Sequence, residues 1–139
     1  MYCDDYIVSD FFKQNIEKVL DMNISSLQKY EYFHKFKDTN KLNNMNNIYT
    51  KEYNNMILKC ISEKDDFNMF LKTMEIYYDK FHTLIKFCKY SKPNSKIHMY
   101  ILNNYCYDDI CKQKLKHDYI EYNGCKFCDK LCLEIYLLN

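Results

Sequence analysis

Apolar residues recur every three or four positions along most of residues 1–90, and this is the period of an α-helix. Three such runs begin next to a serine or threonine, whose side chains are well suited to cap a helix N-terminus. They start at Ser9, at Ser25 or Ser26, and at Thr50. A polar stretch rich in asparagine, residues 38–47, lies between the second run and the third. The pattern therefore predicts three amphipathic helices, with a loop before the third.

The longest apolar stripe begins after Asp65 or Asp66 and continues to Cys88. Its spacing predicts one unbroken helix of about six turns. The helix must end before Pro93, because proline has no backbone N–H and cannot continue the hydrogen-bond ladder. The segment "KIHMYILNNY" that follows is apolar and short, so it suits a strand or a helix, and we favour a helix.

These elements together predict an all-α fold, a compact bundle of four to six helices. A chain of 139 residues is long enough to bury a core of its own. We place a helical body at residues 1–95 and a small cysteine-rich module, packed on that body, at residues 96–139.

Charge and hydropathy exclude several classes of protein. The net charge is +1, and neither half of the chain is basic enough for a strong nucleic-acid binder. No apolar run approaches the length of about 18 residues that suggests a membrane span. The start "MYCDDYIVSDFF" also lacks the charged and then apolar order of a secretory signal. We expect an intracellular protein, in the cytoplasm or nucleus, with no membrane partner.

Amino-acid usage is biased, since Asn, Lys, Tyr, Ile and Phe are abundant whereas Ala, Arg and Trp are absent. A very AT-rich genome imposes this pattern through its codons. The 15 tyrosines are therefore explained by codon usage and core filling, without a base-stacking surface.

Five of the eight cysteines are crowded near the end of the chain: Cys106, Cys111, Cys125, Cys128 and Cys132. Thiols stay reduced inside cells, so the cluster indicates a metal site or catalysis before disulfides. Zinc is commonly bound by two close pairs of ligands joined by a longer connection.

The preferred ligands are Cys106 and Cys111, spaced C-x4-C, with Cys128 and Cys132, spaced C-x3-C. Cys125 is the substitute, because it forms a C-x2-C pair with Cys128, and His117 is a further candidate ligand. Gly124, the only glycine, lies just before this pair in "EYNGC", where a turn with positive φ would lead into a helix that carries the second cysteine pair.

Three other interpretations of the cysteines stay open. They could be unrelated buried thiols, they could form disulfides across a helical hairpin, or "CKFC" could be the centre of a thiol–disulfide enzyme. The enzyme is disfavoured because such sites follow a strand, and no strand pattern is present. The isolated Cys3, Cys60 and Cys88, like His34, His82 and His98, are assigned to packing or surface positions.

The segment "KFCDKLCLEIYL" resembles the second half of FCS- or MYM-type zinc fingers. In that family an aromatic residue precedes the third cysteine, three residues separate the third cysteine from the fourth, and an apolar helix follows. Phe127, Cys128 and Cys132 match this order, and "CYDDICKQKL" resembles the first knuckle through Cys106 and Cys111. The resemblance covers residues 104–137.

The first knuckle departs from the family, because it has four residues between its cysteines where the family has two. Asp129 stands where the family has serine, and no glycine follows Cys111. Such fingers occur in late transcription factors of poxviruses and related large DNA viruses, whose genomes are often AT-rich. The resemblance therefore implies a bound zinc ion and a viral, transcription-associated role.

We expect a non-enzymatic zinc-binding adaptor that binds a protein partner, with nucleic acid as a second class of partner. Five lysines near the cysteines would then be the phosphate contacts: Lys112, Lys114, Lys116, Lys126 and Lys130. The alternative is a virus-encoded helical bundle that binds a helix of a host protein and whose cysteines are incidental. The oligomeric state is left open.

Overall fold

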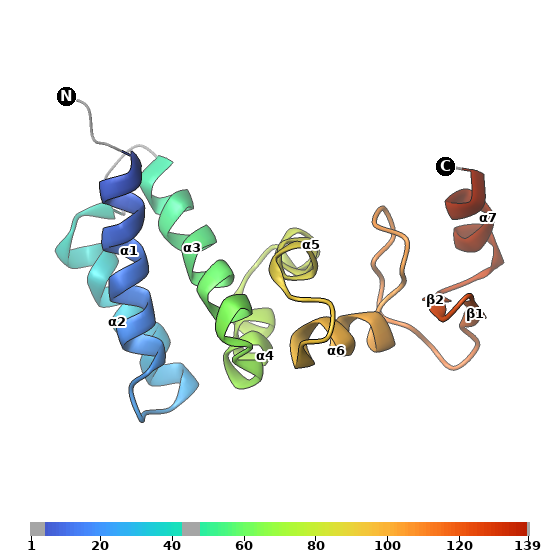
Figure 1. Ribbon diagram of the computed structural model, residues 1–139, viewed down its shortest axis with the longest axis horizontal. Coiled ribbons are helices and arrows are strands. Elements are labelled where there is room, and N and C mark those ends of the chain that lie inside the picture. Colours follow the sequence, from blue (N-terminus) through green and yellow to red (C-terminus); the bar gives the residue numbers. More distant parts are fainter. Residues whose placement is uncertain (1–4, 43–47, 139) are drawn as a thin grey trace. The chain divides into compact units, whose positions relative to one another are not determined.

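The computed structural model describes residues 5–42 and 48–138, and the chain divides into two compact units at Ile76 and Tyr77. The described residues contain seven helices and one two-stranded sheet (Figure 1). The predicted all-α fold with a C-terminal cysteine cluster is confirmed, although the helices are more numerous than expected. The division lies earlier than the predicted boundary after residue 95. No helix in the described part of the chain is long and apolar enough to cross a membrane.

Four helices form the first unit: α1 (Asp5–Leu20), α2 (Ser26–Thr39), α3 (Ile48–Lys64) and α4 (Phe67–Ile76). Helix α1 packs against α2 and α3, and α4 packs against the same two helices. The side chains at the centre are largely aromatic and β-branched. Tyr53 is fully buried there, with its ring stacked on Phe36 and its hydroxyl donating to Asn15 Oδ1 at 2.8 Å. The helical periodicity of the sequence thus locates this core correctly.

The sequence predicted a serine or threonine cap for each of the first three helices, and the structure confirms this for only one of them. Ser25 caps α2 as predicted, because its hydroxyl accepts from the Gln28 N–H at 3.2 Å and the Gln28 side chain accepts from the Ser25 N–H at 3.0 Å. Ser9 and Thr50 do not cap their helices, since α1 begins at Asp5 and α3 at Ile48. The predicted loop over residues 38–47 lies partly outside the described residues, but α2 does end at Thr39.

The predicted long helix over residues 65–88 is wrong, because the structure contains two helices there. Helix α4 ends at Ile76, and α5 (Lys80–Tyr90) begins after Asp79, whose carboxylate accepts from the His82 N–H at 3.1 Å. Of this stripe, Phe70 and Leu84 are buried, whereas Leu71, Tyr78 and Phe81 are exposed. Apolar spacing therefore revealed neither the exposed positions nor the break in the backbone hydrogen bonds. This break coincides with the division between the two units.

The turn between α3 and α4 shows how the chain stops a helix without glycine. Asp65 has a φ of 50°, its N–H donates to Ser62 O at 3.2 Å, and the next N–H, from Asp66, donates to Ile61 O at 3.0 Å. These two bonds make a Schellman C-cap, in which aspartate tolerates the left-handed conformation. Asp66, one of the two residues predicted to start this helix, then caps α4 by accepting from the Met69 N–H.

In the second unit, α5 packs against α6 (Lys96–Asn104). The segment "KIHMYILNNY" is therefore helical for most of its length, as predicted. Ser95 caps α6 by accepting from the His98 N–H at 3.1 Å, and Ser91 Oγ lies 2.9 Å from His98 Nδ1.

A short hairpin that the sequence analysis did not predict follows: β1 (Ile120–Tyr122) pairs antiparallel with β2 (Cys125–Phe127). Asn123 and Gly124 join the strands with φ of 50° and 78°, which are the values of a type I′ turn. Positive φ at Gly124 is as expected, but the turn leads into a strand before it leads into a helix. Helix α7 (Lys130–Leu138) follows β2 and contacts both strands.

The capping box of α2 yields a test of the fold that is independent of the cysteines. We expect Ser25→Ala to lower the free energy of unfolding of the first unit by about 1 kcal/mol, because the Gln28 N–H loses its acceptor. Ser26→Ala, one residue inside the helix, should change it by less than about 0.5 kcal/mol. Urea denaturation followed by helical circular dichroism measures both values, and equal losses would contradict the assignment of Ser25 as the cap.

Candidate metal centre

Four cysteine side chains converge in the second unit: Cys106, Cys111, Cys128 and Cys132. Their Sγ atoms all lie within 4.8 Å of one another. The Cys128 Sγ is 3.4 Å from the Cys111 Sγ and 3.2 Å from the Cys132 Sγ. These are the four residues that the C-x4-C and C-x3-C spacings selected, so the fold brings together the preferred set.

The first pair lies in a knuckle whose two arms are tied to each other. An isolated antiparallel bridge joins Tyr105 to Lys114, and the Cys106 N–H donates to Gln113 O at 2.8 Å. Within the knuckle the Cys111 N–H donates to Asp108 O at 3.0 Å. The two extra residues of the C-x4-C spacing are therefore accommodated in a closed turn, and both thiols still reach the cluster.

Lys112 occupies the position where the finger family has glycine, and it has a positive φ of 41°. Its side chain is only 2% exposed. The ammonium donates to Tyr107 O at 3.1 Å, lies 3.3 Å from the Asp109 carboxylate, and sits 5.5 Å from the centre of the Tyr107 ring. These contacts stabilise a backbone conformation that a lysine seldom adopts. They also remove Lys112 from the surface where a phosphate would bind.

The second pair is carried by the junction between β2 and α7. Cys128 follows the last residue of β2, and Cys132 lies in the first turn of α7. The Asp129 carboxylate accepts from the Cys132 N–H at 2.8 Å, so it caps this helix. Aspartate is among the most favourable N-cap residues, so Asp129 is well suited to this position.

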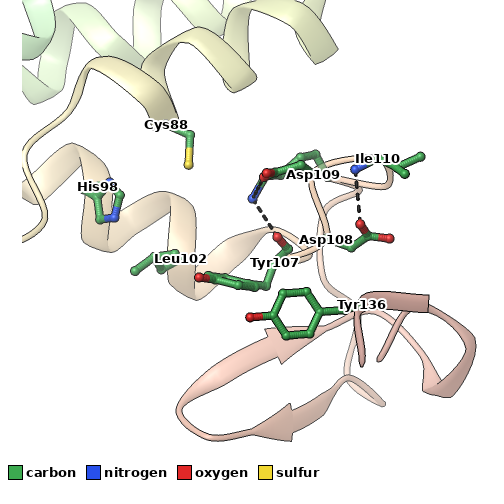
Figure 2. A pocket seen from close by; sticks show the side chains of 9 residues that line it. Cys88, His98, Leu102, Tyr107, Asp108, Asp109, Ile110 and Tyr136 are labelled. Atoms are coloured by element: carbon green, nitrogen blue, oxygen red, sulfur yellow. Dashed lines mark hydrogen bonds and ion pairs between the residues drawn. The ribbon is translucent and has the colours of Figure 1, made fainter. Parts of the chain in front are cut away.

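Three aromatic rings support the knuckle from one side. Phe127 is fully buried, and its ring centroid lies 5.8 Å from that of Tyr107 and 5.2 Å from that of Tyr136. Tyr107 and Tyr136 also contact each other edge to face (Figure 2). Because these rings come from the first knuckle, from β2 and from α7, they hold all three cysteine-bearing segments in register.

Backbone N–H groups point at the sulfur atoms. The Cys128 N–H lies 3.4 Å from Cys106 Sγ, and the backbone of Gln113 donates to Cys111. Burial opposes ionisation of Cys111, but the Gln113 N–H and the bonds from the other three thiols together lower the pKa of Cys111. Burial raises the pKa of Cys128 to about 11, and burial likewise raises the pKa of Cys132. Among these three thiols, Cys111 is therefore the most readily ionised, whereas Cys128 and Cys132 keep their protons near pH 7.

The geometry fits a single tetrahedral cation. Four sulfurs bound at a zinc–sulfur distance of about 2.3 Å would stand about 3.8 Å apart. The observed separations of 3.2 and 3.4 Å, with all four sulfurs within 4.8 Å, bracket this value. A disulfide would need sulfurs about 2.05 Å apart, and the described cysteines are free thiols. The arrangement could therefore hold one metal ion between the four sulfurs.

The substitute ligands lie outside the cluster. Cys125, in β2, is not one of the converging thiols, and it interacts with the Tyr107 hydroxyl, whose pKa it raises. His117 lies in an exposed loop. Of the remaining lysines, Lys114 and Lys116 are exposed, Lys126 donates to Asn103 at 3.2 Å, and Lys130 pairs with Glu134 at 3.9 Å.

A pocket of about 470 Å³ opens beside the knuckle, and Cys88 and His98 both face it (Figure 2). Burial raises the pKa of the Cys88 thiol, and burial together with the charge of Lys112 lowers the pKa of His98. Both groups are therefore neutral near pH 7, and His98 Nδ1 is already bonded to Ser91. This pair lacks the thiolate that a cysteine nucleophile requires.

Comparisons with protein families, with characterised proteins and with solved structures find no significant match to this chain. The resemblance of residues 104–137 to FCS- or MYM-type fingers thus stays a prediction. What the structure itself establishes is a chain of helices with four converging cysteines that could hold a metal ion.

Proposed function

We propose that this chain is a non-enzymatic zinc-binding adaptor, in which one zinc ion bound by Cys106, Cys111, Cys128 and Cys132 holds a C-terminal module ready to bind a partner. The single observation that supports this most is the convergence of four thiols from two distant segments of the chain. Incidental cysteines, as in the alternative of a plain helical bundle, would have no reason to meet in this way.

Zinc is the metal that suits the site best. Four sulfur ligands in a tetrahedral arrangement select zinc or iron over the hard cations magnesium and calcium, which prefer oxygen. The site also has the closed form of structural zinc sites, because four protein ligands leave no open position for water or substrate. A metal ion whose four ligands all come from the protein suits a structural role and argues against metal-assisted catalysis.

The packing of α7 supports a structural role for the metal. None of its side chains is buried, so apolar burial contributes little to holding this helix in place. An isolated helix of nine residues is marginal in water. A structural zinc ion contributes on the order of 10 kcal/mol to the folding of a small finger, which is enough to order α7 and the knuckle together.

The adaptor role rests on the resemblance to FCS- or MYM-type fingers and is therefore proposed for a viral, transcription-associated assembly. A protein is the favoured partner, because the chain is nearly neutral and Lys112, the lysine closest to the knuckle, is buried. Nucleic acid stays the second class of partner, through the exposed Lys114 and Lys116. Binding that weakens steeply with salt would identify phosphate contacts.

Metal content tests the proposal directly. Protein purified without added metal should contain one zinc ion per chain by atomic spectrometry, and Cys128→Ser should lose it, because a tetrahedral site cannot spare a thiolate. Cys125→Ser is the matched control, three residues away and outside the cluster, and it should keep full occupancy. If the protein contained iron in place of zinc, the site would stand but the proposed identity of the metal would be wrong. Metal-free protein with eight reactive thiols would refute the metal site.

The protonation of the cluster yields a second test. Cys128 and Cys132 hold protons in the metal-free protein because burial raises the pKa of both, so zinc must displace these protons. Apparent zinc affinity should therefore fall as the pH falls, by up to about tenfold per pH unit for each proton released. Competition with a chromophoric chelator at pH 6.5 and 7.5, corrected for the chelator's own titration, measures the change. An affinity that is constant across this range would show that the thiols are not the ligands.

A further inference from the structure

Three of the four cluster thiols are open to solvent. Cys106 is fully buried, whereas Cys111, Cys128 and Cys132 are each partly exposed. A cysteine bound to zinc is a thiolate, which is the form that reacts with oxidants. Susceptibility to oxidation follows thiolate character and exposure together, so a small oxidant such as hydrogen peroxide can attack this site.

A second thiol stands beside the exposed Cys128. The Cys132 Sγ lies 3.2 Å from the Cys128 Sγ, and a disulfide bond at about 2.05 Å would bring the two sulfurs only about 1.2 Å closer. Both residues are partly exposed, and they lie on either side of Asp129, the N-cap of α7. Cysteines that respond to oxidants are accessible and have such a resolving thiol next to them.

We propose that Cys128 and Cys132 form a peroxide-sensitive switch, in which a disulfide bond between them releases the zinc ion and uncouples α7 from the first knuckle. The inference deepens the proposed adaptor function and rests on it, because zinc must be bound at the four cysteines before it can be released. Peroxide would then switch off the module that binds the partner.

The reaction consumes one hydrogen peroxide for each disulfide. The Cys128 thiolate attacks one oxygen of the peroxide, so that a sulfur–oxygen bond forms, the oxygen–oxygen bond breaks, and the departing hydroxide takes a proton and leaves as water. The Cys132 thiolate then attacks the sulfenic sulfur of Cys128, and the second oxygen also takes a proton and leaves as water. Two electrons pass from the sulfurs to the peroxide. Cys106 and Cys111 alone remain as ligands, and two thiolates do not complete a four-coordinate site.

Sequence separation selects Cys132 over Cys111 as the partner of Cys128. Both sulfurs are close to the Cys128 Sγ, at 3.2 Å and 3.4 Å. Cys132 is four residues from Cys128 along the chain, whereas Cys111 is 17 residues away in a separate knuckle. The shorter loop costs less conformational entropy to close, so Cys132 stays a neighbour as the zinc coordination weakens.

The choice of partner decides what happens to α7. A Cys128–Cys132 bond leaves no link through sulfur between the first knuckle and α7, whereas a Cys111–Cys128 bond would keep one. Helix α7 buries no side chain, so it has little else to hold it in place. Helices α5 and α6 pack on each other and contain none of the four cluster cysteines. Oxidation should therefore loosen α7 and leave α5 and α6 folded.

Disulfide mapping of the zinc-loaded full chain tests the proposal. Hydrogen peroxide should release zinc to a chromophoric chelator, with the loss of two free thiols for each zinc ion. Trypsin separates the two cysteines because it cuts after Lys126 and Lys130. After catalase removes the excess peroxide and N-ethylmaleimide blocks the free thiols, the digest should contain residues 127–130 linked to residues 131–139. Amide hydrogen exchange should accelerate in α7 and stay unchanged in α6.

Two variants that replace a thiolate ligand by an imidazole ligand provide a matched comparison. Cys132→His cannot form the proposed disulfide, whereas Cys111→His retains both members of the pair. With one zinc ion bound to each variant, peroxide should release zinc about tenfold more slowly from Cys132→His than from Cys111→His, because its remaining thiols must close a longer loop. If either variant fails to bind zinc, the disulfide map of the unaltered chain decides.

The possible results distinguish this inference from the proposed function. Zinc-loaded protein that keeps its zinc in peroxide refutes the switch alone. So does zinc release with residues 97–112 linked to residues 127–130, or with a disulfide that includes Cys125. Protein that contains no metal after purification refutes the zinc-binding adaptor and the switch together.

Discussion

The sulfur atoms of Cys106, Cys111, Cys128 and Cys132 meet where the first knuckle, the end of β2 and the start of α7 come together. The knuckle, the hairpin and α7 are too short to build a core, and α7 buries no side chain at all. Phe127 and Cys106 are the only side chains of the described residues from 105 onward in the fully buried apolar set. Hydrophobic burial is therefore weak here, and the zinc ion that we propose would supply the missing link between these segments, as in other small domains.

The surroundings of the cluster show how this chain tolerates departures from the finger pattern that its sequence resembles. Lys112 adopts a positive φ in place of glycine, and its buried ammonium is satisfied by the Tyr107 carbonyl and the Asp109 carboxylate. Asp129 replaces a serine and performs the same capping role. These two departures keep a backbone requirement and change only the side chain that meets it, whereas the longer first knuckle is a change in spacing.

A comparison of individual elements shows which features of the fold can be predicted from residues that are close together in the sequence. The helix start at Ser25 or Ser26, the helix start at Asp65 or Asp66 and the helix at "KIHMYILNNY" depend on residues close together along the chain, and each was predicted. Only the structure selects Ser25 and Asp66 as the caps. The break at Asp79 was missed because the apolar stripe continues through it, and the hairpin was missed because strands of three residues are too short to show alternation. Asn123 and Gly124 were the available signs of a hairpin turn.

For the candidate metal centre, the sequence by itself determined which cysteines are close neighbours along the chain. It also indicated that two such pairs could bind one tetrahedral metal ion. Only the tertiary structure decided that Cys132 belongs to the cluster and Cys125 does not. The same applies to Lys112, a surface lysine by composition and a buried cation in the fold. The number of residues between two side chains limits how far apart they can be. The direction in which each side chain points depends on strand register, helix phase and turn geometry, and these are set only when distant segments of the chain pack together.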